Sequence, residues 1–181
     1  MKPASFEYHR PASIDEALGL LATHGAAAKL IAGGQSLVPM MNMRLASPAQ
    51  LVDINDLSEL ARVRLAGERI EVGALARHQE IANSALVRAQ CPLLAQAVRT
   101  IGHLAIRHRG TAGGSLVHAA PAAQHALVAV TLDAQLTLAP GQTRALRWFL
   151  PPEDGTDSFL EVWLPEGSAT AVSAPLRAPG V

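Results

Sequence analysis

Apolar positions near the N-terminus recur at the spacing of a helix. They are Ile14, Ala17, Leu18 and Leu21. Ser13 precedes them and Glu16 follows three residues later, which is the capping-box pattern that begins a helix. Gly25 is a residue type that ends helices. The pattern therefore predicts a helix that begins after Ser13 and ends at Gly25.

Short apolar or alternating segments that follow predict strands. Residues 29–32 are apolar after Lys29 and are bounded by a glycine pair, which predicts a buried strand entering a tight turn. Residues 51–54 predict a second strand. Residues 69–73 alternate between polar and apolar, and a turn at Gly67 predicts a hairpin with residues 61–65.

The pattern after residue 76 is mostly helical. Helices are expected at residues 77–82, from Pro92 to Gly102, and from Pro121 to Ala129, and strands at 134–138 and 159–163. The glycine-rich residues 110–115 are expected to form a turn, and the tail after Pro165 is expected to be frayed. Strands mixed with helices, without regular βαβ alternation, predict the α+β class rather than a doubly wound sheet.

Composition narrows the function. The 181 residues carry 15 Lys+Arg and 15 Asp+Glu, so the chain has no excess positive charge for nucleic acid or an anionic membrane. One cysteine, Cys91, excludes a disulfide framework within the chain, a Cys₄ zinc site and a Cys-ligated iron–sulfur cluster. Any such redox centre is expected on a partner.

Localisation is inferred from apolar runs and from the free thiol. Every apolar run is broken by Gly, Pro or His well before about 18 residues, so no membrane span is expected. The N-terminus lacks the apolar region of a secretory signal. Together with the single thiol, this predicts a cytoplasmic protein.

Two glycine motifs repeat each other. Residues 32–38 (AGGQSLV) and 112–117 (AGGSLV) differ by one inserted Gln. Adjacent glycines permit φ > 0 and turn backbone N–H groups toward an anion, so two such turns would hold a pyrophosphate from two sides. Two ordinary Gly-Gly turns are the alternative. Neither motif fits the Rossmann or P-loop pattern.

Other candidate residues have ordinary structural explanations. His103 and His108, like His118 and His125, lack acidic or Cys neighbours at ligand spacing, so no metal site is expected. Positive charge beside the second glycine motif either attracts phosphate or belongs to a solvated loop (Arg99, Arg107, His108 and Arg109). Three methionines are expected to fill the core under the first motif (Met40, Met41 and Met43), and Cys91 is expected to be inert.

The two motifs and the blocks between them resemble a known family. The blocks are 29–45, 51–55, 70–74, 92–94 and 106–115, in this order. Together they resemble the medium, FAD-binding subunit of the molybdenum hydroxylases, the family of aerobic carbon monoxide dehydrogenase and xanthine dehydrogenase. The resemblance covers about residues 1–165.

The resemblance implies an FAD-binding domain of the vanillyl-alcohol-oxidase (PCMH) type, with FAD between two subdomains, 1–58 and 59–165, followed by a frayed tail, 166–181. It implies no catalytic residue on this chain, a heterotrimer with a molybdenum-binding large subunit and a [2Fe-2S] small subunit, and electron transfer from those clusters to an acceptor. The implied FAD contacts are Lys29, Leu30, Ile31, Ala32, Gly33, Gly34, Gln35, Ser36, Ile101, Thr111, Ala112, Gly113, Gly114, Ser115, His118, Gln124 and Leu160.

The sequence departs from the family in three respects. Ala120 and Gln124 stand where many relatives have acidic residues, and the usual C-terminal domain is expected to be absent. A different class of function therefore stays open, a non-catalytic assembly subunit that has lost productive flavin.

Overall fold

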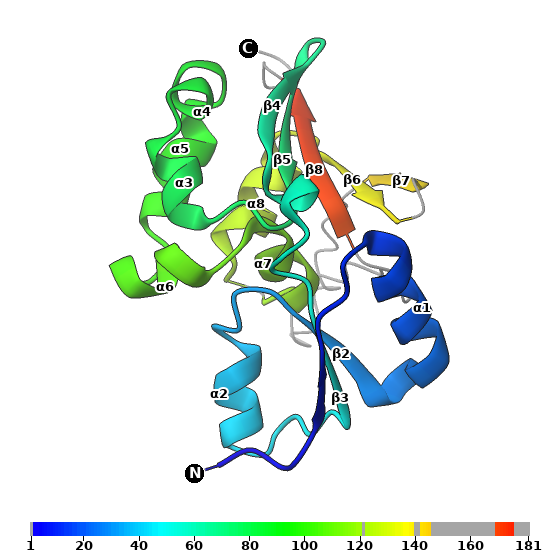
Figure 1. The fold of residues 1–181 in the computed structure, drawn as a ribbon. Coiled ribbons are helices and arrows are strands. Elements are labelled where there is room, and N and C mark those ends of the chain that lie inside the picture. Colours follow the sequence, from blue (N-terminus) through cyan, green and yellow to red (C-terminus); the bar gives the residue numbers. More distant parts are fainter. Residues whose placement is uncertain (1, 121, 140–141, 146–168, 176–181) are drawn as a thin grey trace, which may run out of the picture. The chain divides into compact units, whose positions relative to one another are not determined.

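The computed structural model describes the chain except for residues 1, 121, 140–141, 146–168 and 176–181 (Figure 1). The chain divides into two compact units, Met1–Glu59 and Leu60–Val181. The division falls one residue after the boundary expected from the sequence, and the expected tail belongs to the second unit. None of the helices in the described residues is long and apolar enough to cross a membrane.

The first unit is a three-stranded parallel sheet with helices in its connections. Its strands are β1 (Glu7–His9), β2 (Ala28–Ile31) and β3 (Gln50–Asp53), in the order β1-β3-β2. This regular βαβ alternation was not expected, because β1 is short and its residues carry no apolar pattern. The α+β description therefore holds for the chain as a mixture of helices and strands, but not within this unit.

Helices α1 (Ile14–His24) and α2 (Leu37–Asn42) connect the strands, and a 3₁₀ turn, Gly25–Ala27, lies before β2. The first crossover passes over β3 to β2 and the second returns, so right-handed connections put the two helices on opposite faces, as Figure 1 shows. The N-cap at Ser13 is confirmed, since Glu16 N–H donates to Ser13 Oγ (3.1 Å), but the second bond of a capping box, from Ser13 N–H to the Glu16 carboxylate, is not formed. The Glu16 carboxylate accepts from the backbone of Ala12, one residue before the cap.

The second unit contains a five-stranded sheet in the order β4-β5-β8-β6-β7. The hairpin is confirmed as β4 (Val63–Ala66) and β5 (Arg69–Gly73), after a 3₁₀ turn, Ser58–Ala61. Strands β6 (Gln135–Leu138), β7 (Gln142–Ala145) and β8 (Ala169–Pro175) complete the sheet. The expectation of a frayed tail is wrong for β8, which pairs with both β5 and β6. The expected strand at 159–163 lies outside the described residues.

The helices of the second unit pack against one another and, through α7, against this sheet, and together with the sheet they form the larger core. Four of them, from the segment before the second glycine motif, are α3 (His78–Asn83), α4 (Ala85–Gln90), α5 (Pro92–Arg99) and α6 (Leu104–Arg109). They are followed by α7 (Ala112–His118), which contacts β5 and β8, and by α8 (Gln124–Thr131), which contacts α5 and α7. α8 begins three residues after Pro121, later than expected. Fully buried Ile70, Ile81, Val87, Val98 and Leu116 lie at the centre of this core.

Candidate functional site

The first glycine motif forms the turn between β2 and α2. Gly34 has φ +68°, a conformation that glycine adopts without strain and L-residues rarely adopt. A Cβ at this position would lie 3.1 Å from Val38 Cγ2 and 3.3 Å from Ile31 Cδ1. The expected positive φ is confirmed here, and the turn has no room to spare for a side chain.

The backbone N–H groups of this turn are available to a ligand. Within the part of the chain that the structure describes, the N–H groups of residues 33–37 donate to no protein acceptor. The turn uses its carbonyl groups instead: Gln35 Nε2 donates to the Gly33 carbonyl (2.8 Å), and the Gly34 carbonyl accepts from Val38 N–H (3.0 Å). Successive unpaired N–H groups are what an anion such as a diphosphate requires.

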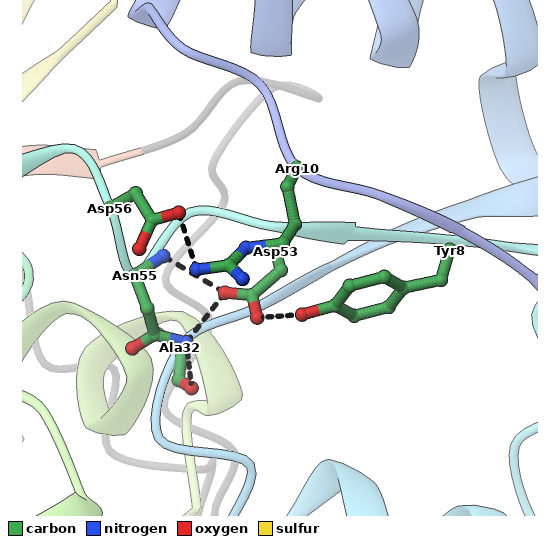
Figure 2. Close-up of polar contacts among 6 residues, drawn as sticks. All are labelled: Tyr8, Arg10, Ala32, Asp53, Asn55 and Asp56. Carbon is green, nitrogen blue, oxygen red and sulfur yellow. Dashed lines mark hydrogen bonds and ion pairs between the residues drawn. The ribbon is translucent and has the colours of Figure 1, made fainter.

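A polar cluster adjoins the start of this turn (Figure 2). Asn55 donates to the Ala32 carbonyl, Asp53 accepts from Asn55 and from the Tyr8 hydroxyl, and Arg10 pairs with Asp56. Residues 51–55 belong to one of the blocks that resemble the family, but a role for Asn55 could not be predicted, because its contact with Ala32 joins residues 23 positions apart.

The second glycine motif is helical, which corrects the expected turn. Gly113 and Gly114 lie in the first turn of α7, and neither has a positive φ. The backbone N–H groups of residues 112–115 all have protein acceptors: the Ala76 carbonyl (3.0 Å), the Ala74 carbonyl (2.9 Å), Thr111 Oγ1 (3.1 Å) and the Thr111 carbonyl (3.0 Å). These four N–H groups therefore do not form the second half of an anion cradle.

Close packing explains the glycine at position 113. A Cβ there would lie 2.6 Å from Ala74 Cβ and 2.9 Å from Ala74 Cα, so only glycine lets α7 approach the segment after β5. At Gly114 a Cβ would lie 2.8 Å from Thr111 Oγ1, the side chain that caps the helix. The two AGG motifs thus have different structures despite their similar sequences.

The remaining predicted contacts lie in both units. Lys29 is exposed on β2 and His118 is exposed at the end of α7, while Ile101 and Gln124 are half-buried. Gln124 is the first residue of α8. Leu160 lies outside the described residues.

Two histidines 47 positions apart form a buried pair that no local pattern in the sequence predicts. His125 Nε2 and His78 Nδ1 are 2.9 Å apart, and both side chains are almost completely buried. Burial lowers the pKa of His78 to about 4, with further lowering by Arg77 and Arg107, and burial and His78 lower the pKa of His125 to about 3. Both rings are therefore neutral at pH 7, one donating to the other. No group of three or more metal-ligating side chains occurs among the described residues.

Arg107, in α6, and Arg99, at the end of α5, donate hydrogen bonds to backbone carbonyls. Arg107 donates to Gln79 Oε1 (3.1 Å) and to the carbonyls of Ile101 (3.1 Å) and Gly102 (2.9 Å). Arg99 donates to the Ala82 carbonyl (3.2 Å). These hydrogen bonds give both side chains a structural role and decide neither for phosphate attraction nor for a solvated loop.

Cys91 and one of the three methionines are buried in the core. Cys91 is buried, and burial raises the pKa of its thiol, which disfavours the reactive thiolate. Met41 is buried as expected for core filling, Met40 is half-buried, and Met43 is 51% exposed, which contradicts core filling there.

Comparison with known proteins gives consistent matches. Residues 4–149 match the family model described as the FAD binding domain in molybdopterin dehydrogenase. The 6-hydroxypseudooxynicotine dehydrogenase complex subunit alpha of Paenarthrobacter nicotinovorans is 47% identical over 137 residues, which are 76% of this chain and 46% of that protein. The carbon monoxide dehydrogenase medium chain of Hydrogenophaga pseudoflava is 37% identical over 180 residues, 99% of this chain and 60% of that protein.

The fold of the chain also matches the folds of solved structures. The carbon monoxide dehydrogenase of Hydrogenophaga pseudoflava that lacks the Mo-pyranopterin moiety matches with a TM-score of 0.86 and 36% identity, over 99% of this chain and 62% of that chain. Quinoline 2-oxidoreductase of Pseudomonas putida 86 matches with a TM-score of 0.87 and 30% identity, over 98% and 61%. The chain thus spans about half to three fifths of the length of the relatives that it matches.

Proposed function

Because the chain belongs to the family of FAD-binding domains in molybdopterin dehydrogenases, we propose that it is the FAD-binding part of an electron-transfer subunit in a molybdenum and iron–sulfur hydroxylase. The fold that we propose for it is of the vanillyl-alcohol-oxidase type. FAD, when bound, supplies the redox chemistry by taking up electrons and passing them to an acceptor.

One observation carries this proposal: within the described residues the N–H groups of residues 33–37 have no protein acceptor, and Gly34 among them has a positive φ. A diphosphate is a doubly charged acceptor that needs several donors at close range, and charge-assisted hydrogen bonds are the strong ones. Ala32, Gly33, Gly34, Gln35 and Ser36 are the residues proposed to hold it, with Lys29, Leu30 and Ile31 at the approach to the turn.

The second unit contributes differently in this proposal. Since the N–H groups of residues 112–115 are occupied, the proposed contacts from this motif are the side chains of Thr111 and Ser115 and the surface of the exposed Gly114. Thr111 Oγ1 accepts from Gly114 and retains its own hydrogen for donation. Ile101, His118, Gln124 and Leu160 are proposed as further contacts.

Partners and location are part of the proposal. A relative is named a medium chain and another a complex subunit, which supports a heterotrimer with a molybdenum-binding large subunit and a [2Fe-2S] small subunit. The one cysteine here is buried, so a cluster must obtain its thiolates elsewhere. The cytoplasm is the proposed location.

Titration of the purified chain with FAD tests the proposal. We expect saturable binding of one FAD per chain, with the absorbance band of bound oxidised flavin at about 450 nm retained after gel filtration. Loss of all flavin from a folded chain would contradict it and would favour the assembly-subunit alternative, which the replacements at Ala120 and Gln124 motivate. Circular dichroism establishes that the chain used is folded.

A further inference from the structure

The carbonyl groups of the first glycine turn are held by two side-chain amides. Asn55 Nδ2 donates to the Ala32 carbonyl at 2.9 Å, and Gln35 Nε2 donates to the Gly33 carbonyl at 2.8 Å. These two carbonyls belong to the peptide groups whose N–H groups are those of Gly33 and Gly34.

Peptide geometry transmits this restraint to the N–H groups. A trans peptide is planar, and its N–H points opposite to its C=O. A side chain that fixes the Ala32 carbonyl therefore also fixes the direction of the Gly33 N–H, and one that fixes the Gly33 carbonyl fixes the Gly34 N–H. Both N–H groups are unpaired donors within the described part of the chain.

The sheet register places Asn55 at this carbonyl. Asp53 pairs with Ile31 across β3 and β2, and Ile54 N–H donates to the Ile31 carbonyl at 3.1 Å. The segments that follow β2 and β3 thus leave the sheet side by side, so that Asn55 reaches Ala32, the residue that follows Ile31.

Asp53 fixes the orientation of the Asn55 amide. Its Oδ1 accepts from Asn55 Nδ2 (2.6 Å) and from Asn55 N–H (2.9 Å). The NH₂ group thus faces two acceptors, Asp53 Oδ1 and the Ala32 carbonyl. A flipped amide would turn its oxygen toward both of them, so only one orientation is favourable.

Tyr8 in turn fixes Asp53. Its hydroxyl donates to Oδ2, the oxygen that Asn55 does not use (Figure 2). Burial raises the pKa of Asp53, but hydrogen bonds from Tyr8 and Asn55 outweigh this, so its pKa lies below the ordinary 3.8. The hydrogen bond to Asp53 raises the pKa of Tyr8 above 10.0. The pair is therefore a phenol donating to a carboxylate at neutral pH.

We propose that Tyr8, Asp53 and Asn55 form a positioning relay that, together with Gln35, orients the N–H groups of Gly33 and Gly34 toward the diphosphate of FAD. This inference rests on the proposed function. None of the three relay side chains needs to touch the cofactor, since the relay acts through the Ala32 peptide.

The relay is tested by FAD titration of the full chain and of the variants Asn55→Ala and Tyr8→Phe. We expect the dissociation constant of FAD to rise roughly tenfold for Asn55→Ala and roughly threefold for Tyr8→Phe, because an orienting contact is lost directly in one and indirectly in the other. Asp56→Asn is the matched control. It breaks the exposed ion pair with Arg10 beside Asn55 and, among the described residues, removes no side-chain hydrogen bond to the turn, so it should leave the dissociation constant within about twofold of wild type.

The ³¹P resonances of bound FAD provide a readout that a merely structural role would not change. At saturating FAD the diphosphate shifts should move in Asn55→Ala and in Tyr8→Phe, and stay unchanged in Asp56→Asn. Wild-type affinity and unchanged shifts in both relay variants would overturn the relay while leaving the proposed function intact. A folded wild-type chain that binds no FAD would overturn the proposed function, and the relay with it.

Discussion

At the scale of single residues, the His78–His125 pair links protonation to the stability of the second unit. Gly110 lies against the His78 ring, where a Cβ would be 2.7 Å from Cδ2 and Nε2, and the Gly110 carbonyl accepts from His78 N–H. The pair thus adjoins the segment that leads into α7. Protonating either ring places a charge in an apolar core beside Arg77 and Arg107.

The sign of the pH dependence follows from the lowered pKa values. The unfolded histidines take up protons near pH 6.5, whereas the folded ones resist until about pH 4 and about pH 3. The contribution of the two neutral histidines to the free energy of unfolding is therefore complete above pH 6.5. Below this pH it decreases by up to about 1.4 kcal/mol per pH unit for each histidine. The free energy of unfolding, measured by urea at several pH values between 7 and 5, should decrease less steeply with falling pH in His78→Gln than in wild type. An equally steep decrease in both proteins would contradict the account.

At the scale of elements, α7 ends on an unusual residue. Ala119 is its C-cap and has φ 51° and ψ 33°, a left-handed conformation that costs an L-residue energy and glycine little. Its N–H donates to the Leu116 carbonyl and closes the helix. The conformation is thus imposed by the turn, at a position that glycine would fill better.

Ala119→Gly should raise the free energy of unfolding by about 0.5–1 kcal/mol, because the left-handed strain is removed. The same substitution at Ala89, an exposed residue within α4, should lower it by a similar amount, since glycine weakens helices. Thermal unfolding of the two variants and of wild type measures whether each substitution raises or lowers the stability. Equal destabilisation by both would show that Ala119 is unstrained.

The sequence predicted the elements that local pattern determines. Ser13 and Glu16 lie one helical turn apart, and the hairpin around Gly67 closes over a few residues, so both could be predicted. α7 could not, because glycine weakens helices and its first turn depends on contact with Ala74, 39 residues earlier. β8 consists largely of small residues, and its partners in β5 lie about a hundred residues away.

The same reasoning applies to the candidate site. The positive φ of Gly34 could be predicted, because a glycine pair after a strand is a local signal. Two identical AGG triplets gave no means of telling a turn from a helix. The contacts of Tyr8 with Asp53 and of Asn55 with Ala32 form only through strand pairing, so no local pattern indicates them.

At the scale of the whole molecule, the proposed FAD contacts are distributed over two units. Residues 32–36 belong to the first unit and residues 111–115 to the second. The backbone N–H groups of residues 33–37 are a run of donors without acceptors among the described residues, whereas those of residues 112–115 are all occupied. The central claim is therefore that FAD affinity of the chain depends on the turn at Gly34.

Comparison of Gly34→Ala with Gly67→Ala tests this claim most directly. Both glycines have positive φ, +68° and +60°, so both substitutions carry backbone strain, and Gly67 lies in the β4–β5 hairpin of the second unit. FAD titration should show affinity at least roughly tenfold weaker in Gly34→Ala and within about twofold of wild type in Gly67→Ala. Equal FAD affinity in the two folded variants would contradict the claim that this turn holds the cofactor.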